Sequence, residues 1–327
     1  MTEPSPLTEP SPLTESSPLT GPSPLTEPPA ASAPSADTAP AGGPPSTARV
    51  DAHHHVWDLA VRDQPWTAGL PPLRRSFGLA DLRPAARRAN VTATVLVQTI
   101  TVPEETPEML ALAAAEPLIA GVVGWTALDS PAIADTLAEL RELPGGGALV
   151  GIRHQVQEEP DPRWLCRPEV RRGLAAVGDA GLAYDLLLTA GQLPAAVETV
   201  RALPEVRFVL DHAGNPPADD EAAAAAWRRD VLELSRSENV TVKLSGLVTR
   251  GYPDPVPPDL LRSWAQTLLD GFGPGRMMFG SDWPVCTLSS TYDEVVAVAD
   301  DAVAGLSAAE RASVFAGTAT QFYRLTR

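Results

Sequence analysis

The feature that most constrains this chain is a regular alternation of short apolar runs with longer stretches of helical period. From Arg49 onward, runs rich in Val, Leu and Ile alternate with segments rich in Ala, Leu, Arg and Glu. Such alternation is typical of repeated βα units that build a parallel sheet. Eight strands favour a closed (β/α)₈ barrel over an open doubly wound sheet, and no glycine-rich phosphate loop follows any of them. The predicted strands occupy 49–57, 93–99, 119–128, 149–157, 182–189, 207–214, 240–247 and 276–284.

Helices are predicted in the gaps between these strands and after the last one. Two of them have clear start signals, because Pro131 follows Ser130 and Pro168 opens its helix. Together with the strands they predict the α/β class and a TIM barrel. The predicted helices occupy 79–90, 105–115, 131–141, 168–180, 192–202, 222–237, 257–271, 292–304 and 307–315.

The first 48 residues differ in composition from the rest of the chain. A hexad, Thr-Glu-Pro-Ser-Pro-Leu, repeats with small changes over 2–25, and the segment holds 13 of the 35 prolines and no aromatic residue. It offers too little apolar surface to offset the entropy of ordering it, so a disordered, Pro-rich N-terminal tail is predicted over 1–48. The remaining residues, 49–327, have the size of one barrel domain.

Charge and cysteine content narrow the partners and the compartment. The net charge of −16 makes phosphate groups repulsive, so neither nucleic acid nor an anionic membrane is predicted as a partner. The chain has no apolar run of about 18 residues, and its N-terminus lacks the features of a secretory signal. Two cysteines, Cys166 and Cys286, cannot form a disulfide framework. These features suit a cytoplasmic protein that acts on a small molecule, and they leave the oligomeric state open.

All five histidines fall at the ends of three predicted strands. In a (β/α)₈ barrel the carboxyl ends of the strands carry the chemistry, so these positions are the first candidates for an active site. The seventh strand contains the sole lysine, and the eighth ends in an aspartate. The polar residues at these strand ends are His53, His54, His55, Arg153, His154, His212, Lys243, Ser245 and Asp282.

Spacing in the first strand predicts which of its histidines act together. Residues i and i+2 of a strand share a face and lie about 6.6 Å apart. His53 and His55 therefore point together and can reach one metal ion, whereas His54 points toward the helical layer. With His212 or Asp282 completing the ligands, a divalent ion would keep an open position for polarising a carbonyl or acidifying water. The alternative, a hydrogen-bonded structural role, weighs more for a lone histidine.

Other polar residues admit two interpretations each. Asp282, at the end of the last strand beside the histidines, is the natural general base, or else a turn residue of Ser-Asp-Trp-Pro. Lys243 and Ser245 share a strand face, and Lys243 either binds substrate or forms a buried ion pair with a carboxylate. Asp185 and Asp211 adjoin the predicted inward positions, so a structural role is predicted for both.

Five motifs of this sequence together resemble the amidohydrolase-related metal-dependent hydrolases. They are Asp-Ala-His-His-His-Val-Trp at 51–57, Gly-Ile-Arg-His at 151–154, Val-Leu-Asp-His-Ala-Gly at 209–214, Val-Lys-Leu-Ser-Gly-Leu at 242–247 and Phe-Gly-Ser-Asp-Trp-Pro at 279–284. The likeness covers about 49–325 and is greatest to the sugar-acid lactonases, with L-fuconolactonase, L-rhamnonolactonase and 2-pyrone-4,6-dicarboxylate lactonase. It implies a (β/α)₈ barrel that hydrolyses a lactone. Members of this branch differ in metal use, so the resemblance implies either one divalent ion, zinc foremost, or none.

The resemblance also implies a role for each matching residue. His53 and His55 match the first-strand pair and, with His212 and Asp282, are the implied metal ligands. Asp282 matches the aspartate that activates water, and His154 and His212 are the other catalytic candidates. In the implied mechanism, Asp282 takes a proton from water as it attacks the carbonyl, and Asp282 or His154 returns it to the ring oxygen. The candidate substrate-binding residues are Arg153, Lys243, Ser245, Trp57 and Trp283.

Two other functions are kept as alternatives. A metal-dependent, non-oxidative decarboxylase of an unsaturated or aromatic acid would use a similar barrel, with Arg153 and Lys243 holding the carboxylate. A non-enzymatic barrel would bind a sugar acid or scaffold a partner, but it gives no reason for buried ionisable groups that lower stability. The tryptophans Trp57 and Trp283 either line a pocket or pack in the core. The chain departs from the family pattern at Thr318, where Asn is usual.

Overall fold

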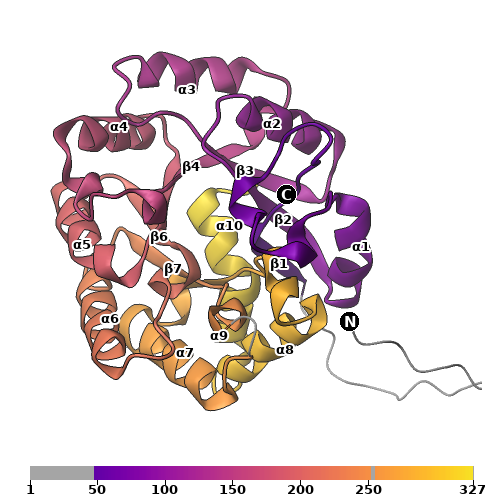
Figure 1. Cartoon of the computed structure of the whole chain (residues 1–327), viewed down its shortest axis with the longest axis vertical. Helices are drawn as coiled ribbons and strands as arrows, with labels where there is room; N and C mark the ends of the chain where they lie inside the picture. Colours follow the sequence, from indigo (N-terminus) through magenta and orange to yellow (C-terminus); the bar gives the residue numbers. More distant parts are fainter. Residues whose placement is uncertain (1–47, 252–254, 327) are drawn as a thin grey trace, which may run out of the picture. The chain divides into compact units, whose positions relative to one another are not determined.

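The computed structural model describes residues 48–251 and 255–326. The tail predicted over 1–48 lies outside these residues except for its last position, and it stays a prediction. Within the described residues, eight strands form a single sheet in the order β1 to β8, and each neighbouring pair is parallel (Figure 1). The strands are β1 Arg49–His54, β2 Val91–Val97, β3 Ile119–Gly124, β4 Leu149–Gln155, β5 Ala183–Leu187, β6 Arg207–Leu210, β7 Val240–Leu244 and β8 Met277–Phe279.

The first and last strands meet through a short backbone ladder. His54 and Trp283 form a parallel bridge just beyond the end of β8. The N–H of Asp282 donates to the carbonyl of His53 at 2.8 Å, and the N–H of His55 donates to that of Trp283 at 2.7 Å. These bonds close the sheet on itself, which confirms the predicted (β/α)₈ barrel.

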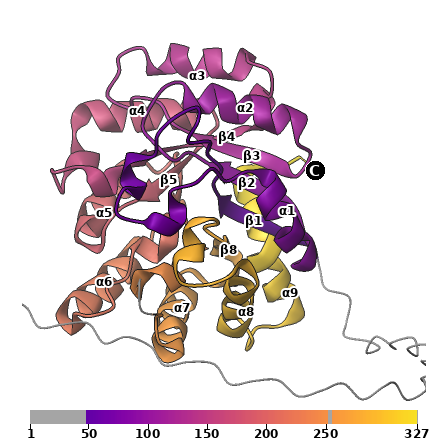
Figure 2. The same ribbon diagram turned by 45° about the vertical axis from the view of Figure 1, so that its right-hand side comes forward.

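Helices surround the strands in both views of the barrel (Figures 1 and 2). Their order confirms the predicted alternation, with differences of a few residues at most ends. The last predicted helix, 307–315, is wrong in extent, because α9 ends at Ala312 and a π-helical segment, η11 Ser313–Gly317, follows it. A further helix, α10, was not predicted. The helices are α1 Leu79–Arg88, α2 Glu105–Ala115, α3 Ile133–Glu142, α4 Pro168–Asp179, α5 Leu193–Ala202, α6 Glu221–Leu234, α7 Pro258–Phe272, α8 Tyr292–Ala302, α9 Ala308–Ala312 and α10 Thr318–Tyr323.

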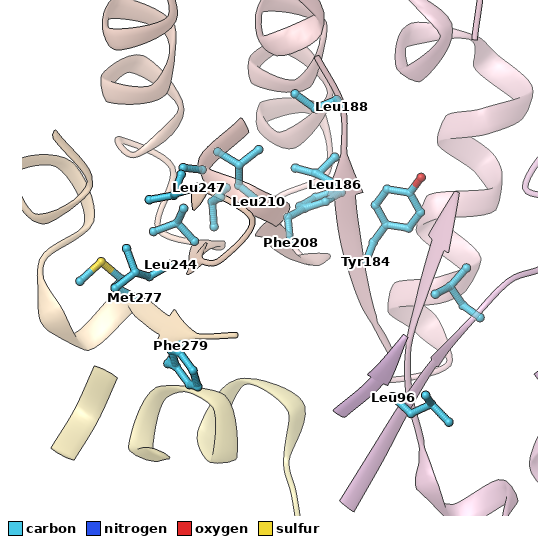
Figure 3. Close-up of a cluster of buried hydrophobic side chains, with 14 of the residues drawn as sticks. Leu96, Tyr184, Leu186, Leu188, Phe208, Leu210, Leu244, Leu247, Met277 and Phe279 are labelled. Carbon is cyan, nitrogen blue, oxygen red and sulfur yellow. The ribbon is translucent and has the colours of Figure 1, made fainter. Parts of the chain in front are cut away.

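Alternate residues of each strand belong to two separate cores. On β5, Tyr184 and Leu186 face outward and join the large cluster between strands and helices, where Phe208 and Leu210 of β6 lie beside them (Figure 3). The intervening Ala183 faces the barrel interior. Because strand side chains alternate between faces, each strand supplies both layers.

The C-terminal helix closes the amino-terminal end of the barrel. Helix α10 lies within the ring of strands in Figure 1, and Ala319 and Tyr323 pack in the interior cluster with Val50 of β1 and Val95 of β2. Thr318, the departure from the family pattern, is buried and its hydroxyl donates to the carbonyls of the loop before β8 at 3.4 Å. Among the described residues, no helix has both the length and the apolar character needed to cross a membrane.

Candidate active site

Three histidines and one aspartate meet at the carboxyl end of the barrel. The Nε2 atoms of His53, His55 and His212 lie 3.8, 3.5 and 3.9 Å from Oδ1 of Asp282. The Nε2 atoms of His53 and His55 are 3.2 Å apart. Residues more than 200 positions apart in the sequence thus converge on one carboxylate oxygen, at the end of the barrel where such folds place their chemistry.

The first strand divides its three histidines between the two faces, as the spacing predicts. His53 and His55 turn to the interior, whereas Nε2 of His54 lies 2.9 Å from the Thr94 hydroxyl on the outer face of β2. The register of β1 against β2 shifts between Asp51 and His54, which marks a bulge in this segment. Asp51 fixes it, because its carboxylate accepts hydrogen bonds from the N–H and hydroxyl of Ser281 at 2.8 and 2.6 Å.

Two of the imidazoles are held through the nitrogen that faces away from Asp282. The Nδ1–H of His55 donates to the carbonyl of Val97 at 2.7 Å, because a carbonyl only accepts. Nδ1 of His212 lies 2.9 Å from the hydroxyl of Ser245. With Nδ1 engaged, Nε2 of each ring is presented toward the carboxylate, the arrangement that second-sphere partners give to metal-binding histidines.

The backbone at two of these residues adopts a left-handed conformation. His212 has φ of 52° and Asp282 has φ of 56°, and neither is glycine. Left-handed backbone costs a non-glycine residue about 1–2 kcal/mol, so surrounding contacts must hold it. At Asp282 these contacts include the donation of its N–H to the carbonyl of His53 and the hydrogen bond from the N–H of Trp283 to the Ser281 hydroxyl at 3.0 Å.

Two glycines make room for the histidine rings. A Cβ at Gly246, where φ is 65°, would lie 2.6 Å from Nδ1 of His212. A Cβ at Gly280 would lie 2.7 Å from Cβ of His53. Any larger residue at either position would therefore displace a histidine of the site.

A network of buried charges lies beneath His53. Nζ of Lys243 is 2.6 Å from Asp185, 2.9 Å from Asp211 and 3.1 Å from Nδ1 of His53. Nη1 of Arg153 lies 3.1 Å from Asp211 and 3.3 Å from Nε2 of His53. The interpretation that Asp185 and Asp211 lie off the inward positions is therefore wrong, because both carboxylates face the barrel interior.

The site combines the neutral imidazoles of His53 and His212 with an ionised carboxylate. Burial raises the pKa of Asp282, but His212 and His55 outweigh this effect and hold the pKa below its ordinary value. Burial and the Lys243 ammonium keep the pKa of His53 well below its usual range. Burial also lowers the pKa of His212 to about 4. A charged Asp282 beside the neutral rings of His53 and His212 can accept a proton or bind a cation.

Most of these residues line a cavity of about 790 Å³. His55, Arg153, His212 and Asp282 contribute to its lining, and Trp66 contributes an aromatic surface. Several lining residues were missed by the sequence analysis because they come from loops, where no periodicity marks the inward face. The missed loop residues include Arg62, Trp66, Asn215 and Arg250, and Gln155 at the end of β4 was missed as well.

His154 does not join this group. Its Nδ1 accepts a hydrogen bond from Nε1 of Trp125 at 3.0 Å, its Nε2 lies 2.8 Å from Glu159, and its ring stacks on Trp164. It follows Arg153 directly on β4, so it faces outward when Arg153 faces inward. The geometry therefore removes His154 from the candidate proton donors.

Four of the five candidate substrate-binding residues are not among the described residues that line the cavity beside Asp282. Trp57 donates from Nε1 to the carbonyl of Arg75 at 2.7 Å, and Trp283 packs edge-on against Phe77. Lys243 is fully buried beneath His53, and Ser245 is occupied with His212. Within the described residues, Arg153 is the one member of this predicted set that lines the cavity beside Asp282.

The donor atoms suit a divalent metal ion. One ligand atom from each of His53, His212 and Asp282 lies within 4.8 Å of the others, and all three residues are buried. Imidazole nitrogen with carboxylate oxygen is a common ligand combination for zinc. His55 stands beside this set through its contacts with His53 and Asp282. The residues therefore fit a metal.

Known proteins with similar sequences cover nearly the whole described chain. L-fucono-1,5-lactonase of Burkholderia multivorans is 39% identical over 289 residues, which span 85% of this chain and 96% of the relative. L-fucono-1,5-lactonase of Burkholderia ambifaria is 37% identical, over 86% and 97%. A B. multivorans amidohydrolase crystallised with bound zinc superposes with a TM-score of 0.81 at 36% identity, over 86% of this chain and all of the other.

A match to a protein family covers a similar share of this chain as the matches to these relatives do. Residues 50–325 of this chain match the protein family described as amidohydrolase. This range contains all eight described strands except Arg49, the first residue of β1, and every residue of the site described above. The chain belongs to the amidohydrolase family.

Proposed function

We propose that the protein hydrolyses the lactone of a sugar acid, with Asp282 activating the attacking water. The observation that carries this proposal is the buried carboxylate of Asp282 in the cavity lining, with imidazole nitrogens of His53, His55 and His212 at 3.8, 3.5 and 3.9 Å. The names of the relatives at 37–39% identity, both L-fucono-1,5-lactonases, support the same reaction.

Asp282 lies beside all three inward imidazoles. Oδ1 is its oxygen nearest to each of His53, His55 and His212. The carboxylate takes a proton from water as the water oxygen bonds to the lactone carbonyl carbon. When the ring C–O bond breaks, the same carboxyl returns the proton to the ring oxygen, and the product is a hydroxy acid.

A bound metal ion and the side chains around it would have separate roles in the reaction. His53, His212 and Asp282 would hold a divalent ion, which supplies Lewis acidity toward the carbonyl or the water. Arg153 contributes to the cavity lining, so its positive charge favours the negative oxygen that forms at the carbonyl, while its N–H groups stay bonded to Asp211 and Gln98. Ser245 orients His212, and Val97 orients His55.

The charges around the cavity favour a neutral, hydroxylated substrate. Of the three arginines in the described lining, Arg153 is committed to Asp211 and Gln98, and Arg62 forms a two-pronged ion pair with Glu108. The third, Arg250, is attracted by the Asp282 carboxylate. A dicarboxylate lactone needs guanidinium groups that are free of protein carboxylates.

Polar and aromatic lining residues suit a sugar instead. Gln155 and Asn215 present amide groups, and Trp66 presents a flat apolar surface. Hydroxyl groups bind amides, and the C–H face of a sugar ring packs on an aromatic side chain. This set supports a sugar-derived lactone as the substrate class.

The test is acid release from a panel of L- and D-sugar lactones, followed with a pH indicator on the purified full chain. Hydrolysis of at least one sugar lactone is expected, and Asp282→Asn should lower kcat by about 10²–10⁴-fold. Asp293→Asn, the same chemical change at an exposed position paired with Arg88, is the control and should retain activity.

Two outcomes would contradict the proposal. Carbon dioxide release from an unsaturated or aromatic acid, with no acid release from lactones, would favour the decarboxylase instead. Binding of sugar acids without turnover of either panel would favour a non-enzymatic barrel. Metal content measured on the same preparation would show whether an ion occupies the histidine cluster.

A further inference from the structure

Tyr323 connects the floor of the barrel to its charged interior. It is the last residue of α10, it is 2% exposed, and it does not contribute to the described lining of the cavity. Its hydroxyl donates to Oδ2 of Asp185 at 2.7 Å. The helix that closes the amino-terminal end therefore hydrogen-bonds to a carboxylate on the inner face of β5.

Asp185 connects Tyr323 to Lys243, which in turn contacts His53 of the candidate active site. The same Oδ2 atom accepts from Nζ of Lys243 at 2.6 Å, and this ammonium lies 3.1 Å from Nδ1 of His53. Lys243, Asp185 and His53 are all completely buried. A continuous series of contacts thus runs from Tyr323 to the imidazole whose Nε2 faces His55 and Asp282.

Stability alone gives little reason for this arrangement. Replacing a buried ion pair by well-packed apolar residues is often neutral or stabilising. The neighbouring inward positions of the same barrel are apolar, with Ala183 on β5, Val209 on β6 and Met278 on β8. Charges at this depth therefore point to a requirement other than packing.

The geometry shows what the Tyr323 hydroxyl constrains. Lys243 has two carboxylates within reach, Asp185 at 2.6 Å and Asp211 at 2.9 Å. Tyr323 holds Oδ2 of Asp185 in place from below, so the ammonium stays between this oxygen and His53. Without the hydroxyl, Asp185 keeps only its bond to Lys243 among the described residues, so the ammonium can shift between Asp185 and Asp211, and Asp211 also lies beside His53.

We propose that Tyr323 is a positioning residue for the active site, which fixes the ring of His53 through Asp185 and Lys243. This proposal rests on the proposed lactone hydrolysis for its kinetic readout. The position of the His53 ring can also be measured without a substrate. The chain contains five histidines, so their ring signals can be assigned individually by NMR.

The experiment compares Tyr323→Phe with Tyr184→Phe. Both remove one buried tyrosine hydroxyl, but the Tyr184 hydroxyl has no hydrogen-bond partner among the described residues and faces the outer layer. In Tyr323→Phe, the ring signals of His53 should move while those of the outward His54 stay in place. In Tyr184→Phe, the signals of His53 should stay in place.

Kinetics give the second readout. Tyr323→Phe should lower kcat on the order of 10-fold with little change in KM, as expected when a supporting partner of a site residue is lost. Tyr184→Phe should keep both constants. A merely structural role for Tyr323 would lower the melting temperature and leave kcat and the His53 signals unchanged, and this result would overturn the proposal.

A second variant covers the case in which Tyr323→Phe fails to fold. Asp185→Asn keeps the shape of the side chain and removes the charge that holds Lys243. It should move the His53 signals at least as far as Tyr323→Phe does, and unmoved signals would overturn the proposal. If the unmodified protein hydrolyses no lactone, the proposed function fails, while the NMR comparison still decides the role of Tyr323.

Discussion

The two ends of the barrel interior use the same strands in opposite ways. At the amino-terminal end the inward positions are apolar, and at the other end they are ionic. On β5, Ala183 is followed two residues later by Asp185, and on β6, Val209 is followed by Asp211. A step of about 6.6 Å along a strand therefore separates packing from chemistry. The comparison indicates that the apolar layer of the barrel interior serves packing, whereas the ionic layer above it supports the candidate active site.

The largest effect on stability is expected from removing the Lys243 ammonium, which lies between the carboxylates of Asp185 and Asp211. Lys243→Met would leave Asp185 and Asp211 without this buried partner, and breaking a buried pair in this way lowers the free energy of unfolding by about 3–5 kcal/mol. Denaturant unfolding of the variant measures the loss.

The apolar end provides the contrast for this measurement. Met278→Ala should cost about 2–5 kcal/mol through a cavity, a loss that no change of charge can recover. In the Lys243→Met background, Asp185→Asn should restore part of the stability because it removes one unpaired charge. If Asp185→Asn restores nothing, the two ends do not differ in the way described.

The next effect concerns a glycine at the ionic end. Gly246→Ala places a Cβ 2.6 Å from Nδ1 of His212, so the ring must move and kcat should fall on the order of 10–100-fold. Gly273→Ala is a matched control, because Gly273 also has φ of 65° but has no atom within 4 Å of an added Cβ. It should lower stability, because φ of 65° with ψ of 170° is a conformation that essentially only glycine adopts, and it should keep a normal kcat. Equal kcat in the two variants would remove the steric argument.

A third prediction follows from the protonation of the site. The pKa of Asp282 lies below its ordinary value and that of His212 is lowered to about 4, so both groups stay in their working forms as pH rises above this range. kcat/KM should therefore fall only below about pH 4 and stay flat from about pH 5 to 7.5. An inflection near pH 6.5, the ordinary value for histidine, would show that an imidazole and not Asp282 limits the reaction.

The success of sequence reasoning also differs between regular strands and loops. The i+2 rule placed His53 and His55 together, and the position of Asp282 after the last strand placed it beside them. The same rule, applied from the apolar Ala183, would have turned Asp185 inward, so that signal was present and was not used. Trp66 and Arg250 lie in short 3₁₀ helices between strands, where tertiary packing sets the inward face and no local sequence pattern predicts it.

The smallest effect is expected at His154, the histidine that alternation turns away from the site. His154→Gln keeps a polar side chain near Trp125 and Glu159 and loses the stacking on Trp164, so the melting temperature should fall slightly. kcat should stay within about twofold of the unmodified protein, because removing a general acid would cost about 10²–10⁴-fold. The kinetic assay on sugar lactones measures this directly. A loss of that size in His154→Gln, with the fold intact, would mean that β4 contributes two neighbouring residues to the reaction. Because adjacent strand residues face opposite sides, such a result would require β4 to change its conformation when substrate binds.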